Sequence, residues 1–151
     1  MRHAQTEPGS GDPPNYVLSD CTTQRNLSEA GREQARRIGA AFRARKVPVE
    51  EVLSSEFCRC LETARLAFGK AEQWPMLNSI FENSALNQAR VTALKERLGR
   101  RPLQGNVVIV SHNVNISAAT GVGPAMGEAV VVAPGENGGF SVLGSLKGEV
   151  Q

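Results

Sequence analysis

His3 and His112 are the only histidines in the 151-residue chain, and each lies where a reactive site can form. His3 begins a long segment rich in glycine and proline, and His112 follows the strongest predicted strand, residues 106–111. Imidazole titrates near neutral pH, so a histidine can act as a nucleophile or exchange a proton. A lone histidine is more often structural, but open α/β sheets bind ligands beyond the carboxyl ends of their strands. The two positions therefore favour a catalytic site.

The elements that must position these histidines alternate along the chain. After a loop over residues 4–27, helices are expected from Ser28 to about Lys46, at 57–68, at 86–98 and just after Asn113. Strands are expected at 51–55, within 74–81, and at 106–111, 128–133 and 140–146. Alternating strands and helices predict a three-layer αβα sandwich on a mostly parallel sheet.

Composition is that of an ordinary globular domain, with 40% apolar and 21% charged residues. The net charge of +2 gives no reason to expect nucleic acid or an anionic membrane as a partner. No apolar run approaches the ~20 residues of a transmembrane helix.

The three cysteines are an odd number, so they cannot all pair within the chain. The Cys58-Arg59-Cys60 segment lacks the spacing of metal ligands, and no second cluster accompanies it. We therefore expect no metal site and favour buried free thiols. A disulfide from Cys21 to one of the other two stays open for an oxidising compartment.

Four segments that include these histidines occur in a fixed order. They are Arg-His-Ala-Gln-Thr at 2–6, Leu-Ser-Glu-Ala-Gly-Arg-Glu-Gln-Ala at 27–35, Ser-Ser-Glu-Phe-Cys-Arg-Cys-Leu-Glu-Thr-Ala at 54–64 and Val-Ile-Val-Ser-His-Asn at 108–113. Together they resemble branch 1 of the histidine phosphatase superfamily, which includes phosphoglycerate mutases and small histidine-phosphate phosphatases. The third segment matches the family pattern throughout, the second has serine for threonine, and the first has Ala4 where the family has glycine.

The resemblance implies a phosphoglycerate mutase-like fold and phosphoryl transfer through His3. His3 corresponds to the family's phosphorylated histidine, and a ring nitrogen can carry a phosphoryl group as a covalent intermediate. Arg2 and Arg59 correspond to arginines that bind phosphate oxygens, a task suited to the bidentate guanidinium group. His112 corresponds to the second family histidine, which stabilises the equatorial oxygens during transfer.

The proton donor to the leaving oxygen is the open role. Members of this branch often place a Glu or Asp before the last segment, and Glu82 is the best-placed candidate, with an ordinary exposed carboxylate as the alternative. Arg25, Asn26 and Asn113 are expected to contact the substrate. The other branch of the family has Asp where Asn113 stands, so the acid phosphatases and phytases fit poorly.

In the family the Arg-His motif closes a first strand inside the sheet, but only Met1 precedes it here. We therefore expect residues 1–151 to form a single, N-terminally truncated domain that lacks most of this strand. The alternative is a fragment with an incomplete sheet and a poorly held His3. Because an upstream leader could have been lost, a periplasmic location stays open beside the cytoplasmic default.

The expected function is hydrolysis of a phosphate monoester or phosphohistidine through a phosphohistidine intermediate on His3, without metal or cofactor. The partner is then a small phosphorylated substrate or a phosphoprotein. One alternative is a phosphate-binding or regulatory module in which catalysis has decayed. A phosphoglycerate mutase is less favoured, since 151 residues leave little room for its substrate-enclosing segments. The sequence does not define the oligomeric state.

Overall fold

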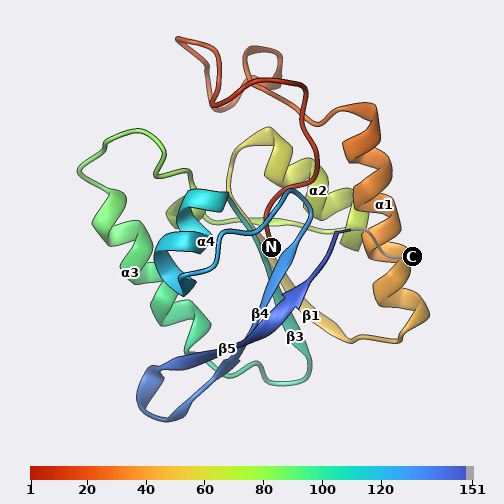
Figure 1. The fold of residues 1–151 in the computed structure, drawn as a ribbon, viewed down its shortest axis with the longest axis vertical. Helices are drawn as coiled ribbons and strands as arrows, with labels where there is room; N and C mark the ends of the chain where they lie inside the picture. Colours follow the sequence, from red (N-terminus) through yellow and green to blue (C-terminus); the bar gives the residue numbers. More distant parts are fainter. Residues whose placement is uncertain (149–151) are drawn as a thin grey trace.

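The computed structural model describes residues 1–148, and its helices and strands alternate as the sequence predicts (Figure 1). The α-helices are α1 (Glu29–Ala44), α2 (Cys58–Phe68), α3 (Asn87–Leu98) and α4 (Asn113–Thr120). The strands are β1 (Val49–Ser54), β2 (Glu72–Gln73), β3 (Asn106–Val110), β4 (Ala129–Pro134) and β5 (Phe140–Leu146). β2, β1 and β3 form a parallel sheet in that order, and β4 pairs with β5 as an antiparallel hairpin. The predicted fold class is confirmed, while residues 149–151 of the expected domain lie outside the described range.

Each face of the sheet is covered by two helices. Neighbouring residues of a strand point to opposite faces, so Val52 and Leu53 of β1 enter different parts of the core. Val52 belongs to a buried cluster with Ala64 of α2, and Leu53 to another with Leu94 of α3 and Ala119 of α4. Figure 1 shows α1 and α2 on one side of the sheet and α3 and α4 on the other. The sheet is therefore buried between two apolar layers, which gives its carboxyl edge a rigid support.

The short segment that ends in His3 extends the sheet beyond β3. Arg2 forms a parallel bridge with Ser111, and the His3 N–H donates to the Ser111 carbonyl at 3.1 Å. On the other side, the Arg2 N–H donates to the Glu128 carbonyl at 3.0 Å, and the Gly127 N–H donates to the His3 carbonyl at 2.9 Å. The backbone of His3 is thus held from two sides, contrary to the alternative of a poorly held histidine.

An apolar groove of about 500 Å³ continues from this segment between β3 and β4. β3 pairs with β1 on its other edge, and β4 pairs with β5 on its other edge. Within residues 1–148, only the segment that ends in His3 joins the two facing edges. The groove is lined from the helix layers by side chains such as Ile38, Phe42 and Leu98. In the described residues, this short segment is what lies between β3 and β4, where a longer strand is expected from the family resemblance.

Residues 4–27 form the predicted long loop, which several contacts tie to the rest of the domain. Thr6 and Leu27 form an antiparallel bridge near the two ends of the loop. Within it, Asp20 caps a short 3₁₀ helix by accepting a hydrogen bond from the Thr22 N–H at 3.1 Å. The loop is therefore ordered by specific contacts along its length.

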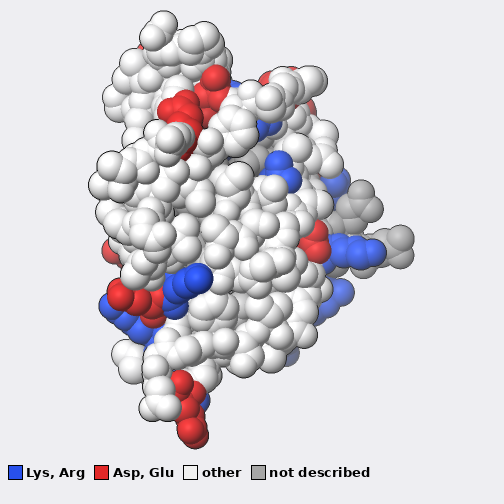
Figure 2. Space-filling view, turned by 60° about the vertical axis from the view of Figure 1, so that its left-hand side comes forward, with Lys and Arg blue, Asp and Glu red and all other residues white. Residues whose placement is uncertain are grey.

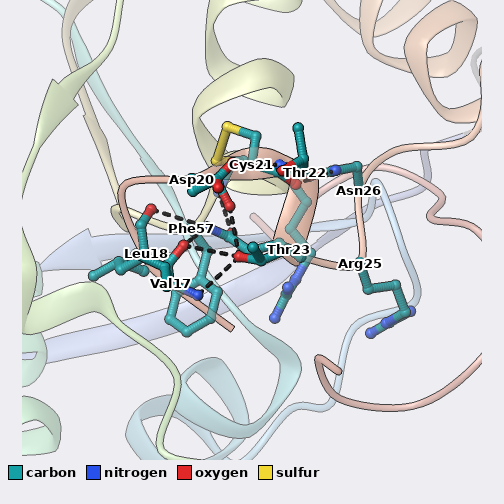
Figure 3. The surroundings of a disulfide bond; sticks show 12 residues. Val17, Leu18, Asp20, Cys21, Thr22, Thr23, Arg25, Asn26 and Phe57 are labelled. Carbon is teal, nitrogen blue, oxygen red and sulfur yellow. Dashed lines mark hydrogen bonds between the residues drawn. A yellow bond between two sulfur atoms is a disulfide. The ribbon is translucent and has the colours of Figure 1, made fainter. Parts of the chain in front are cut away.

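A disulfide between Cys21 and Cys58 joins this loop to the first residue of α2 (Figure 3). The Cys58 N–H also donates to the side-chain oxygen of Gln24 at 3.0 Å. The expectation of free thiols is wrong for this pair, because the path of the loop brings two cysteines 37 positions apart into contact. It is confirmed for Cys60, which is fully buried and free.

One predicted strand is wrong. The sequence predicts a short strand within residues 74–81, whereas β2 ends at Gln73 and Pro75–Leu77 form a 3₁₀ turn. The Trp74 N–H still donates to the Ser54 carbonyl at 2.8 Å, so pairing reaches this residue. The proline that follows has no N–H to continue the ladder, and its fixed φ suits the first position of a turn.

Charged side chains lie in small groups of both signs. Figure 2 shows one face of the molecule, on which such groups border a broad uncharged area. Arg32 of α1 forms an ion pair with Glu62 at 2.8 Å, which links α1 to α2, and a second pair with Glu29 of its own helix at 3.3 Å. In the described part of the chain, no helix is long and apolar enough to cross a membrane.

Candidate active site

The structure brings most of the predicted site residues together in a cleft of about 220 Å³. The cleft lies at the carboxyl edge of the sheet, under the loop that crosses the top of Figure 1. The predicted residues that line it are Arg2, His3, Arg25, Arg59, Glu82, His112 and Asn113. The fold thus brings together residues from five segments that lie far apart in the chain.

His3 has one ring nitrogen engaged by the backbone and one left for chemistry. Its Nδ1 lies 2.8 Å from the Ala4 carbonyl oxygen, which can only accept, so Nδ1 carries the proton and Nε2 has a free lone pair. Burial is the main cause that lowers the pKa of His3 to about 3; the bond to Ala4 opposes this effect, and the charges of Arg59 and Arg2 add to it. The imidazole is therefore neutral at pH 7 and able to act as a nucleophile.

Ala4 and Thr63 connect the histidine to α2. The Ala4 N–H donates to Thr63 Oγ1 at 3.0 Å, and the Thr63 hydroxyl donates to the Arg59 carbonyl at 2.7 Å. Both residues are fully buried. The fold thus accommodates the side chain of Ala4 at the position where the family motif has glycine. Through these hydrogen bonds, Thr63 fixes the spacing between His3 and the helix that carries Arg59.

Arg59 lies in the first turn of α2 with its side chain only 4% exposed. Its Nη1 contacts both carboxylate oxygens of Asp12, at 2.8 and 3.0 Å. The guanidinium carbon lies 4.8 Å from the centroid of the Phe57 ring, a cation–π contact. Its Nε is buried and has no hydrogen-bond partner.

Arg2 shows the same pattern. One of its terminal nitrogens donates to the Pro124 carbonyl at 3.2 Å, while its Nε is buried without a partner. Burial and the nearby charge of Arg59 lower the pKa of Arg2. Buried donors are nearly always paired, so two unpaired guanidinium N–H groups beside one cleft indicate a site for an oxyanion.

His112 is fixed by a chain of hydrogen bonds behind it. The Ser55 hydroxyl lies 2.8 Å from His112 Nε2 and donates to Asn78 Oδ1 at 3.1 Å, so Nε2 is the donor to Ser55. His112 Nδ1, 3.5 Å from Arg59 Nη2, is then the free acceptor. Burial, followed by the charge of Arg59, lowers the pKa of His112 well below its usual value. Its ring centroid lies 5.8 Å from that of His3, so the two imidazoles face one cleft.

The remaining predicted residues differ in their placement. Glu82 lines the cleft from the exposed loop before α3, and Asn113, the first residue of α4, has a buried Oδ1 without a partner. Arg25 also lines the cleft and bonds to the Gly11 carbonyl at 2.8 Å. Asn26 is not brought into the cleft, because its side-chain nitrogen donates to the Cys21 carbonyl at 2.7 Å.

Four residues of the site carried no clear signal in the sequence. They are Asp12, Tyr16, Phe57 and Asn78. The rings of Tyr16 and Phe57 lie 5.5 Å apart, and those of Phe57 and His112 lie 5.0 Å apart, which forms an aromatic wall. Burial and the charges of Glu82 and Asp12 raise the pKa of Tyr16. Among residues 1–148, no three His, Cys, Asp or Glu side chains are arranged to hold a metal ion.

Acid is expected to destabilise the fold through His3. Its folded pKa of about 3 lies below the ordinary value of 6.5, so between these values the unfolded state binds the extra proton. The free energy of unfolding should therefore fall as the pH drops through this window, by up to about 1.4 kcal/mol per pH unit for one group. Urea unfolding from pH 7 to 4 should show a shallower fall in His3→Asn. If the free energy of unfolding falls equally in the wild type and in His3→Asn, His3 is not buried in its neutral form.

Comparison with known proteins gives a family match. The model of the histidine phosphatase superfamily (branch 1) matches residues 1–81, which include His3 and Arg59. A comparison with curated proteins gives no match.

Solved structures with the same fold cover nearly the whole chain. The protein histidine phosphatase SixA complexed with tungstate is 19% identical with a TM-score of 0.62, over 98% of this chain and 94% of that chain. A protein of Agrobacterium tumefaciens proposed to be the phosphohistidine phosphatase SixA is 22% identical with a TM-score of 0.61, over 96% and 93%. A protein of Escherichia coli proposed to be an alpha-ribazole-5'-P phosphatase is 18% identical with a TM-score of 0.63, over 95% and 93%. At these identities the likeness establishes the fold alone.

Proposed function

Because the chain belongs to branch 1 of the histidine phosphatase superfamily, we propose that it is a phosphatase that forms a phosphohistidine on His3. The observation that carries the proposal is the state of the cleft. A neutral histidine with a free Nε2 shares it with the buried Arg59 and the half-buried Arg2, and the Nε of each arginine is buried and unpaired. A nucleophile and an oxyanion site side by side are the parts that phosphoryl transfer needs.

The chemistry divides between these groups. A phosphate group binds to Arg2 and Arg59, and Nε2 of His3 attacks phosphorus while the ester bond breaks. The hydrogen bond from Nδ1 to the Ala4 carbonyl supports the positive charge that develops on the ring. Water then attacks the phosphohistidine, which releases inorganic phosphate and restores the free imidazole.

His112 is proposed to support the transferred phosphoryl group. Its Nδ1 lies at the Arg59 side of the cleft as an acceptor, while its Nε2 is held by Ser55. To donate to an equatorial oxygen, Nδ1 must take up a proton when the anion binds. A bound dianion favours that protonated form, because opposite charges stabilise one another.

The proposed substrate is a phosphate monoester or a phosphohistidine, and no metal or cofactor takes part. The names of the structural relatives are consistent with both classes, since one is a protein histidine phosphatase and another is proposed to act on a ribazole phosphate. Arg25 and Asn113 line the same cleft and are proposed to contact the substrate, whereas Asn26 lies outside it. The proton donor is proposed to be a carboxyl group, and Glu82 is the candidate from the sequence.

One observation favours a second candidate, a module that binds phosphate without turnover. The Asp12 carboxylate forms an ion pair with Arg59, so this arginine is already paired with an anionic group of the chain itself. In such a module, phosphate would exchange with this carboxylate and no covalent intermediate would form.

Trapping the intermediate separates the two candidates. We expect protein mixed with ³²P-labelled aryl phosphate or a phosphohistidine peptide, and quenched in alkali, to retain one label per chain. The label should be lost in acid, because phosphohistidine is stable to base and labile to acid. Turnover and labelling should be the same with and without a chelator. Phosphate binding with neither label nor turnover would favour the module, and loss of turnover with chelator would refute the metal-free mechanism.

A further inference from the structure

We propose that Asp12 is the proton donor to the leaving oxygen. The proposal deepens the proposed phosphatase function and rests on it. Asp12 comes from the loop over residues 4–27, and its side chain is only 6% exposed although the loop lies at the surface. A carboxylate is expensive to bury, so its position against a cleft-lining arginine calls for an explanation beyond loop structure.

The contact with Asp12 leaves free the edge of the Arg59 guanidinium group that is best suited to bind phosphate. Both carboxylate oxygens contact one nitrogen, Nη1, at 2.8 and 3.0 Å. Nε has no partner, and Nη2 has only the long 3.5 Å contact to His112. Nε and Nη2 form the side edge of the guanidinium group, which binds two oxygens of one phosphate. Phosphate and Asp12 can therefore bind Arg59 at the same time.

This arrangement favours a protonated Asp12, which can then supply a proton to the leaving oxygen. A phosphate dianion on the free edge of Arg59 lies next to the Asp12 carboxylate, and two anionic groups in contact hold one proton between them. Asp12 is thereby protonated in the substrate complex, although its side chain is only 6% exposed. General acids of this kind contribute about 10²–10⁴-fold to a rate.

Asp12 also approaches from the correct side. In-line transfer places the leaving oxygen opposite the attacking nitrogen. His3 lies in the sheet, whereas the loop that carries Asp12 arches over the carboxyl edge of the sheet (Figure 1). A group supplied by this loop therefore meets the leaving oxygen and not the nucleophile.

The loop is anchored closely enough to hold such a position. The Arg25 N–H donates to Asp12 Oδ1 at 3.0 Å. The segment just before Arg25 is fixed to α2 by the disulfide (Figure 3) and by the hydrogen bond from the Cys58 N–H to Gln24. Because α2 also carries Arg59, the acid and the arginine are positioned by one helix.

The proton transfers balance over the two steps. In the first, the His3 Nε2–P bond forms, the P–O bond breaks with its electron pair on the leaving oxygen, and this oxygen takes the Asp12 proton. In the second, a water oxygen bonds to phosphorus, the N–P pair returns to Nε2, and the water proton goes to the Asp12 carboxylate. Asp12 thus ends the cycle protonated beside phosphate, as it began beside the substrate.

The test compares leaving groups. In Asp12→Asn, kcat/KM for 2-phenylethyl phosphate should fall about 10²–10³-fold, since an alkoxide needs the proton. The p-nitrophenolate ion leaves without help, so kcat/KM for p-nitrophenyl phosphate should fall less than about tenfold. Inorganic phosphate should bind several-fold more tightly to the variant, because a like charge has been removed. Asp20→Asn, the same change elsewhere in the loop, should alter none of these values.

Other outcomes would overturn the proposal. Equal losses on both esters, with weaker phosphate binding, would give Asp12 a structural role only. Faster turnover of both esters would make it a mere competitor of the substrate. A leaving-group effect in Glu82→Gln and not in Asp12→Asn would assign the proton to Glu82. If the wild type turns over neither ester and traps no label, the phosphatase function itself fails, and this proposal fails with it.

Discussion

Replacing His3 by alanine should reduce kcat/KM for p-nitrophenyl phosphate by at least about 10⁴-fold, since loss of a covalent nucleophile is among the most damaging changes an enzyme can undergo. Both imidazoles of the cleft are neutral, but the acceptor nitrogen of His112 lies 3.5 Å from Arg59 Nη2, whereas Nε2 of His3 has no hydrogen-bond partner within residues 1–148. The labelled intermediate should also disappear. Steady-state kinetics and the alkaline quench measure both effects.

The loss must be separated from a folding defect. His3→Ala keeps both arginines, so inorganic phosphate should still raise its melting temperature, as it does for the wild type. His112→Asn provides the comparison, because it removes a supporting group and leaves the nucleophile. It should turn over slowly and still trap label. Undiminished turnover in His3→Ala would refute the mechanism, whatever its other properties.

Arg59 is expected to show the second large effect, on activity and stability together. Arg59→Met should lower kcat/KM by about 10³-fold or more, the scale found for arginines that stabilise a transferring phosphoryl group. It should also lower the free energy of unfolding by about 3–5 kcal/mol, because Asp12 would remain buried without its partner. Kinetics and urea unfolding on the same protein sample test the two effects.

A double substitution separates the two losses. Adding Asp12→Asn to Arg59→Met removes the stranded carboxylate, so most of the lost stability should return. Activity should not return, because the phosphate still lacks its arginine. Recovery of both would mean that Arg59 serves only to neutralise Asp12. No recovery of stability would mean that the 2.8 Å ion pair is not what holds the loop.

The parts of the site that could be predicted from the sequence lie at the ends of regular elements. His3 follows the bridge at Arg2, His112 lies just beyond β3, and Arg59 lies in the first turn of α2, so short motifs determine both their chemistry and their common edge. Local pattern was also sufficient for most helices. The strand expected within residues 74–81 failed because one proline ends the ladder almost at once.

Asp12 could not be predicted in the same way. It is separated from Arg59 by 47 positions, and nothing in a glycine- and proline-rich segment specifies where its side chain will lie. Its place depends on contacts made elsewhere in the loop, chiefly by Cys21 and Gln24. The same loop path turns Asn26 away from the cleft toward the Cys21 carbonyl.

Because of the disulfide, the stability of this domain depends on the redox conditions of the surrounding solution. In the chain-entropy model, closing a loop across 37 positions lowers the conformational entropy of the unfolded chain. This loss stabilises the folded state by about 4 kcal/mol. That is a large share of the 5–15 kcal/mol that holds an average domain together. Oxidants and thiols in the surrounding solution therefore change the stability of this chain, and the bond on which they act anchors the loop that lines the candidate active site.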